Sequence, residues 1–327
     1  MAVSTQQYGS RLPVRRDRYV ETTQPNQTSY KFQPAKRGTP KEHDHLPLCM
    51  ETSTRPVDVE RDGAPVRSML VAIGLTVFGL AVVPQVTTIP AFVADPALLE
   101  AVQTGEYGET SLLGRTVFMA LNFVGMALAG LIYLLWTDRG LSWIDLRVPT
   151  KRDWIYVLVG SVGSIAFLYV VSFLYGLLGV PAADSQVVDI VGGDPTMVLI
   201  MIAIVFLFNA PAEEFLFRNV IQKRLYEAFS PMQAVLVASV IFALVHFPMY
   251  ALAGSTVATL ASLVIMFGGS VIFGYVYVKA DNLLVPTLAH AALNAFQFVL
   301  LYASMVYGLD EEIATSMLVD VVAFAPL

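Results

Sequence analysis

Hydrophobic residues are concentrated in seven long runs, all of them after residue 68. Each run is close to the ~20 residues that an α-helix needs to cross the hydrocarbon core of a bilayer. The runs are 69–92, 112–136, 154–180, 197–216, 234–253, 256–278 and 283–309. A shorter apolar tail, 313–327, carries Asp320 and is not expected to form a full span. The pattern therefore predicts an all-α fold, a polytopic transmembrane helical bundle of about seven to eight spans.

The first 66 residues have a different character, with Pro, Gln, Thr and Arg spread through them and no apolar stretch of signal-peptide type. Such a segment buries too little apolar surface to offset the entropy lost on ordering. We therefore expect 1–66 to be a disordered arm and 67–327 to be the transmembrane helical domain. The arm holds the single cysteine, Cys49, which excludes an intramolecular disulfide, and an isolated pair, His43 and His45, that is interpreted as incidental.

Composition agrees with a membrane protein. Hydrophobic residues make up 56%, charged residues only 14%, and the mean hydropathy is +0.63. An average soluble domain has about a quarter charged residues. The expected surroundings are membrane lipids, and nothing in the composition indicates a nucleic-acid partner.

The basic residues predict an orientation. Of the 20 Lys and Arg residues, 11 precede the first apolar run. Nearly all the others lie in alternate loops, namely Arg139, Arg147, Lys151, Arg152, Arg218, Lys223, Arg224 and Lys279, with Arg115 as the exception. The remaining loops carry acidic residues or no charged residue at all. By the positive-inside rule, the protein is a multi-pass cell-membrane protein with a cytoplasmic amino terminus.

Five polar residues interrupt the most apolar stretches, namely Glu213, Glu214, His246, His290 and Asn294. Arg218 follows directly after the stretch that holds the two glutamates. Ionisable side chains at membrane depth are costly, and their default interpretation is a functional site that faces the bundle interior. At ~1.5 Å of rise per residue, the glutamates, His246 and the pair on the last run can share one layer in the cytoplasmic half of the membrane.

Helical spacing separates the two glutamates. Glu214 and Arg218 are four residues apart with the acid first, which is the favourable order for an ion pair on a helix. Glu213 is rotated by ~100° from Glu214, so it has a different set of partners and is the carboxylate available for proton transfer. His290 and Asn294 are also four residues apart and point the same way.

These residue types suit hydrolysis by activated water. A carboxylate can act as the general base, and imidazole with carboxamide can donate hydrogen bonds to an oxyanion. They also suit a metal, because Glu213, His246 and His290 form a ligand set of the kind found in catalytic zinc sites. The residues alone leave both chemistries open.

Three stretches carry a family resemblance. They are Glu213-Glu214-Phe-Leu-Phe-Arg218, Phe242-Ala-Leu-Val-His246 and His290-Ala-Ala-Leu-Asn294. They resemble the three motifs of the CPBP family, the CAAX-protease and bacteriocin-processing group that includes Rce1-type proteases. The resemblance covers a protease core of about 197–302 and implies an all-helical intramembrane endopeptidase that acts on a membrane-associated protein or peptide.

The resemblance also implies roles. Glu213 activates the water together with His246, His290 and Asn294 stabilise the oxyanion, and Glu214 with Arg218 holds the site together. Members of the family are described both as zinc enzymes and as metal-independent glutamic proteases. Two features favour the metal-free form: Asn294 is a poor zinc ligand, and Glu214, the one carboxylate placed to orient a ligand histidine, is taken by Arg218.

Two other functions fit intramembrane acids and histidines. One is a proton-coupled transporter, which is disfavoured because we see no inverted repeat and because the polar groups share one depth. The other is a catalytically inactive immunity or scaffold protein, which intact motifs argue against.

Overall fold

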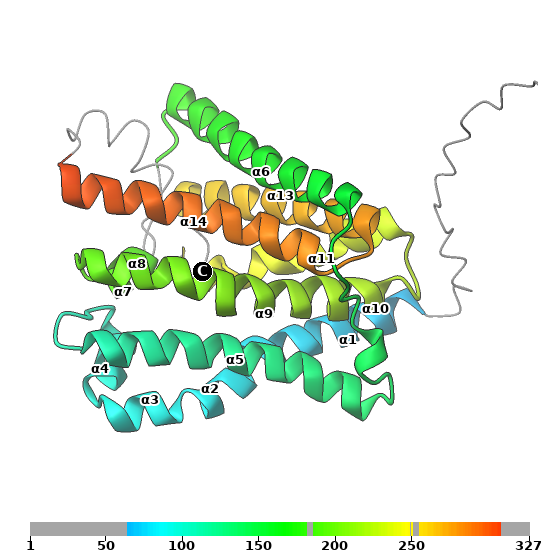
Figure 1. Ribbon diagram of the computed structural model, residues 1–327, viewed down its shortest axis with the longest axis horizontal. Helices are drawn as coiled ribbons and strands as arrows, with labels where there is room; N and C mark the ends of the chain where they lie inside the picture. The colour runs from blue at the N-terminus through cyan, green and yellow to red at the C-terminus, as the bar shows by residue number, and fades with distance from the viewer. Residues whose placement is uncertain (1–63, 182–185, 249, 251–254, 309–327) are drawn as a thin grey trace, which may run out of the picture. The chain divides into compact units, whose positions relative to one another are not determined.

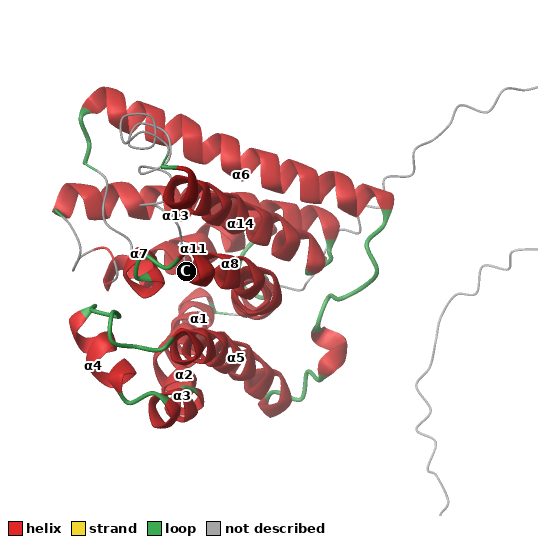
Figure 2. Ribbon diagram, turned by 60° about the vertical axis from the view of Figure 1, so that its left-hand side comes forward, coloured by secondary structure: helices red, strands yellow, loops and turns green. Residues whose placement is uncertain are grey.

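The computed structural model describes residues 64–181, 186–248, 250 and 255–308, all within one compact unit, Val57–Leu327. In these ranges every regular element is a helix and none is a strand (Figures 1 and 2), which confirms the all-α fold. The expected disordered arm with Cys49, His43 and His45 lies outside the described residues except for its last three positions. The tail 313–327 also lies outside them.

Six helical segments are long and apolar enough to cross a membrane. They are Pro65–Ala94, Leu112–Trp136, Lys151–Leu178, Pro195–Leu225, Thr256–Ala280 and Leu284–Tyr307. They confirm six of the seven predicted runs. The seventh run, 234–253, is represented by the shorter helix α11, Pro231–Val245. Its 15 residues rise only ~22 Å at 1.5 Å per residue, less than the ~30 Å of a hydrocarbon core.

The first segment is interrupted. It consists of α1 (Pro65–Val77), the π-helix η1 (Phe78–Val82), α2 (Val83–Thr87) and α3 (Ile89–Ala94). Pro84 and Pro90 each lack a backbone N–H, which explains why the helical hydrogen bonding is irregular here. A short helix, α4 (Ala97–Thr104), follows and ends at Gly105, whose φ of 80° favours glycine.

The next two segments begin with side-chain caps. At the start of α5 (Leu112–Trp136), Ser111 Oγ accepts a hydrogen bond from the Gly114 amide and donates to Asp95 Oδ2 at 2.7 Å. The Ser111 hydroxyl bond holds the pKa of Asp95 below its usual range. After the 3₁₀ turn η2 (Leu141–Trp143), α6 (Lys151–Leu178) begins with a capping box formed by Thr150 and Asp153.

A long composite helix follows the short α7 (Gln186–Val191). It consists of α8 (Pro195–Ile204), the π-helix η3 (Val205–Asn209), α9 (Ala210–Glu214), the π-helix η4 (Phe215–Gln222) and α10 (Lys223–Leu225). Pro211 lies in α9, where it removes one backbone donor. The five residues of α9 thus lie between two π segments, an irregularity that is frequent at functional sites.

This composite helix lies at the centre of the bundle. On one side it packs against α5, which in turn packs on α2 and α3. On the other side α14 (Leu284–Tyr307) packs on α8 and α9, and α6 covers α14 and α13 (Thr256–Ala280), as Figures 1 and 2 show. A Cβ at Gly268 would lie 2.0 Å from Phe167 Cζ, so glycine is what lets α13 approach α6 so closely.

Large apolar side chains remain exposed around the bundle. On α6 they are Trp154, Ile155, Leu158, Val159, Val162, Val170, Phe173, Leu174, Leu177 and Leu178. A continuous apolar surface of this extent is unusual for a soluble protein and is what lipid contact requires. Basic loops and helix ends lie near α10 and the start of α6, whereas α4 and α7 lie at the other end (Figure 1). Which end faces the cytoplasm stays a prediction.

Candidate active site

Glu213 and Glu214 are both buried in α9, with 2% and 0% of their surface exposed. Their principal partners differ, as their helical positions predict. Asn209 Nδ2 donates to Glu213 Oε1 at 2.8 Å, whereas Arg218 Nε donates to Glu214 Oε2 at 2.9 Å. The second oxygen of Glu213, Oε2, has no hydrogen-bond partner among the described residues.

Arg218 is fully buried and connects three helices. Besides its ion pair with Glu214, its Nη2 donates to Ser270 Oγ of α13 at 3.1 Å. The guanidinium carbon lies 5.4 Å from the centre of the Phe242 ring of α11, a cation–π contact. The pair predicted from the sequence therefore exists, and it fastens the glutamate-bearing helix to α11 and α13.

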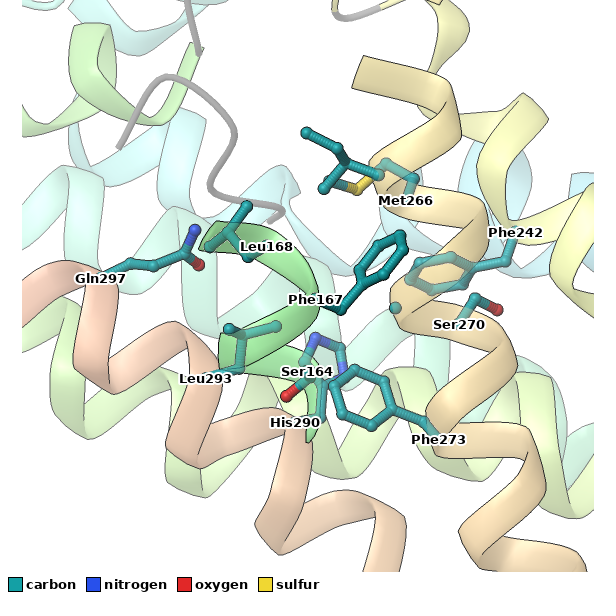
Figure 3. Close-up of a pocket in the computed structure, with 12 residues that line it drawn as sticks. Ser164, Phe167, Leu168, Phe242, Met266, Ser270, Phe273, His290, Leu293 and Gln297 are labelled. Atoms are coloured by element: carbon teal, nitrogen blue, oxygen red, sulfur yellow. The ribbon is translucent and has the colours of Figure 1, made fainter. Parts of the chain in front are cut away.

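His290 lies between the two glutamates. Its Nδ1 is 2.9 Å from Glu214 Oε1, and its Nε2 is 3.9 Å from Glu213 Oε2. A carboxylate can only accept, so the first contact places a proton on Nδ1. The imidazole also stacks on Phe273 at 4.9 Å between ring centres, and Figure 3 shows the two rings side by side. Within the described part of the chain, His290 thus contacts both glutamates.

A pair of asparagines holds Glu213 from the other side. Asn294 Nδ2 donates to Asn209 Oδ1 at 2.9 Å, and Asn209 donates to Glu213. Both asparagines are buried. The sequence interpretation included Asn294 but missed Asn209. The available signal was spacing, because Asn209 precedes Glu213 by four residues and so shares its helix face.

His246 lies at the carboxyl end of α11. Its Nδ1 is 2.7 Å from the Phe242 carbonyl oxygen, one turn earlier, and the two rings lie 4.8 Å apart. Because a carbonyl only accepts, Nδ1 carries the proton and Nε2 is the nitrogen left for other partners. Phe242 therefore packs on His246 as its position in the sequence predicts.

Glu213 and His246 both line a cavity of about 650 Å³, together with Phe217 and Phe242. His290 and Asn294 are not among the described residues that line it. His290 instead borders a separate cavity of about 30 Å³, shown in Figure 3, with Ser164, Ser270 and Gln297. A space of that size holds about one or two waters. The six predicted residues therefore gather in one buried region, where Glu213 and His246 face the larger space.

The geometry of the site supports zinc binding in one respect and opposes it in another. Each imidazole has its Nδ1 engaged, on Glu214 or on a backbone carbonyl, as metal-binding histidines usually do. Glu214 contacts His290 as well as Arg218, so the expectation that Arg218 alone occupies it was wrong. Among the described residues, however, no three His, Cys, Asp or Glu side chains converge with metal-binding geometry.

Residues 195–296 match the family model described as type II CAAX prenyl endopeptidase Rce1-like. This match confirms the CPBP resemblance drawn from the three motifs, and its range includes all six predicted site residues. The six apolar helices indicate a multi-pass membrane protein, and its segment 195–296 is similar to the CAAX-protease family model. Comparison with curated proteins gives no match, and neither does comparison with solved structures.

We expect Arg218→Ala to destabilise the fold. The change leaves Glu214 buried without its main counter-charge, which costs about 3–5 kcal/mol when a buried ion pair is broken. The measurement is thermal unfolding in detergent, with Arg152→Ala, an exposed arginine on α6, as the control. If Arg218→Ala unfolds at the same temperature as the unchanged protein, the pair does not have a structural role.

Proposed function

We propose that this protein is an intramembrane endopeptidase in which Glu213 activates a water molecule for peptide-bond hydrolysis. The observation that carries the proposal is the position of Glu213. Its carboxylate is buried, one oxygen is fixed by Asn209, and the residue lines a cavity of about 650 Å³ beside His246. The substrate class is a membrane-associated protein or peptide, and the site lies in the half of the bundle nearer the basic loops, on the cytoplasmic side in the predicted orientation.

The geometry around Glu213 Oε2 supports a role as general base. The 3.9 Å to His290 Nε2 is too long for a direct hydrogen bond, but one water can contact both atoms. Glu213 takes a proton from this water while the oxygen of the water attacks the carbonyl carbon of the substrate. The same carboxyl group then returns the proton to the leaving amine, which closes the cycle without net proton change.

The other polar residues stabilise this arrangement. His246, the imidazole that lines the cavity with Glu213, assists proton transfer through Nε2. The role that the family resemblance implies for His290 and Asn294 is to stabilise the negative charge on the substrate oxygen. His290 donates to that oxygen from Nε2 as the imidazolium, because its Nδ1 proton is already directed at Glu214 Oε1. Glu214 keeps His290 oriented, and Arg218 balances the charge of Glu214, so the second glutamate acts on the reaction through its neighbours.

Replacing the base tests the proposal directly. We expect Glu213→Gln to abolish cleavage of an internally quenched peptide pool, because the amide is nearly isosteric but cannot accept the proton. Folding is monitored by size-exclusion chromatography and thermal unfolding, and Glu109→Gln, at an exposed turn, is the matched control. Turnover by well-folded Glu213→Gln would show that another group is the base.

Variants of Asn209 and Asn294 distinguish two roles, the positioning of Glu213 and the binding of the oxyanion. Asn209→Ala removes a hydrogen bond to a charged group, worth about 1.5–3 kcal/mol, and should lower kcat roughly 10- to 100-fold. Asn294→Ala should lower kcat by about 10²- to 10³-fold, the usual loss for an oxyanion donor. If Asn294 binds the oxyanion, most of its effect persists when Asn209 is already alanine. If the effect vanishes in the double variant, Asn294 acts only through Asn209.

Metal dependence is decided with purified, active protein. We expect activity to survive chelation and elemental analysis to find well under one zinc per chain. The contrary result is one zinc per chain, with activity lost on chelation and restored by zinc. That result would make Glu213, His246 and His290 ligands of the metal.

A further inference from the structure

We infer that the cavity beside Glu213 is a substrate channel that opens at the α4–α7 end of the bundle, opposite the basic loops. Its occupant is an extended polypeptide segment with apolar side chains. This inference rests on the proposed function, since it names the route and the chemistry of the chain that Glu213 would cleave.

The lining residues give the channel its direction. One end of the cavity is lined by Gln103, Thr104 and Gly105, where α4 ends at the protein surface, and by the exposed Asp189 of α7. At the other end, Glu213 and His246 are only 2% and 6% exposed. The cavity therefore runs from the protein surface to the buried carboxylate.

One face of α5 gives its length. Phe118, Met119, Asn122, Phe123 and Met126 all line the cavity. They extend over nine residues of helix, and the eight steps from the first to the last rise about 12 Å. An extended peptide advances about 3.3 Å per residue, so this wall accommodates roughly three to four residues. The volume of about 650 Å³ also lies within the ~300–1,000 Å³ that is usual for ligand sites.

The chemistry of the wall favours an apolar peptide over a free polar solute. Between the mouth and the carboxylate the lining is mostly Leu, Phe, Met and Val, from Leu80, Phe118, Met119, Phe123, Met126, Phe217, Phe242 and Val245. Asn122 offers an amide along this wall, and Gln103 and Thr104 offer polar groups at the mouth. Burial also raises the pKa of Tyr107, so its phenol stays neutral there.

Polar contacts join the helices and the preceding segment at the opposite end of the bundle. Asn219 and Gln222 of η4 are fully buried just beyond Arg218. Asp145, in the segment before α6, accepts hydrogen bonds from Tyr277 Oη at 2.5 Å and from Lys223 Nζ at 2.6 Å. The Asp145 amide also donates to Asn219 Oδ1 at 2.8 Å. None of these side chains is among the described residues that line the cavity.

Chemical blocking of the mouth tests the channel. In a Cys49→Ser background, Gln103→Cys places a thiol in the lining, and Glu100→Cys places one on the exposed surface of the same helix as the control. Both variants, in oriented proteoliposomes, receive a bulky membrane-impermeant maleimide from one side or the other. Activity is measured with an internally quenched peptide whose centre is Leu, Val and Phe.

We expect modification at position 103 to lower the cleavage rate by about tenfold or more, and modification at position 100 to leave it nearly unchanged. The reagent should act only from the side away from the amino terminus. Unchanged cleavage after complete modification at position 103 overturns the channel, and so does inhibition from the amino-terminal side alone. Loss of activity through an unspecific effect would appear equally at position 100.

A binding measurement separates this inference from the proposed function. Gln103→Cys is combined with Glu213→Gln, which removes the base, and the same peptide is tested for protection of the thiol against the maleimide. Protection supports the channel even if the unchanged protein cleaves nothing, in which case only the proposed function fails. Cleavage by the unchanged protein without protection overturns the channel and leaves the proposed function standing. If phospholipid protects the thiol and the peptide does not, the occupant is a lipid acyl chain and the inference of a peptide channel is overturned.

Discussion

The charge balance around Glu214 is the constraint on which the rest of the site depends. A carboxylate and a guanidinium cannot be taken out of water separately, because each isolated charge would cost several kcal/mol in a medium of low polarity. Arg218 and His290 both contact Glu214, and Ser270 accepts a further bond from Arg218. This network neutralises one glutamate, and the neighbouring Glu213 is buried with one oxygen, Oε2, that makes no hydrogen bond to the described residues.

The same constraint explains the irregular helix that carries the glutamates. A regular α-helix would fix the directions in which Asn209, Glu213 and the residues of the following turn point around the helix axis. Those directions could then not be adjusted to the packing of α5, α11 and α14. The π segments on either side of α9 and the missing donor at Pro211 relax that register. The local backbone thus fits the electrostatic requirement, and both are encoded within residues 205–222.

The sequence predicts those parts of the site that depend on ionisable residues in apolar surroundings. Glu214 with Arg218 was predictable from four-residue spacing, and the gathering of His246 and His290 around them from their similar depth. Asn209 was not, because a neutral amide in an apolar run attracts less attention than a charge and its partner Asn294 lies 85 positions away. The length of α11 was also misjudged, since apolar residues continue past His246 although the helix ends there.

The distribution of charge between the two ends and the direction in which the cavity opens are separate properties. Only the first can be predicted from the sequence. Basic residues predict which loops face the cytoplasm, and the helical rise places Glu213 nearer to that end. The space that reaches Glu213, however, is bordered by α4, Tyr107 and Asp189 at the other end. Depth in the bundle therefore does not by itself say from which side a substrate arrives. In this chain the cavity that borders Glu213 extends along the apolar face of α5 towards α4 and Asp189, and this longer, apolar path is the one that we infer for the substrate.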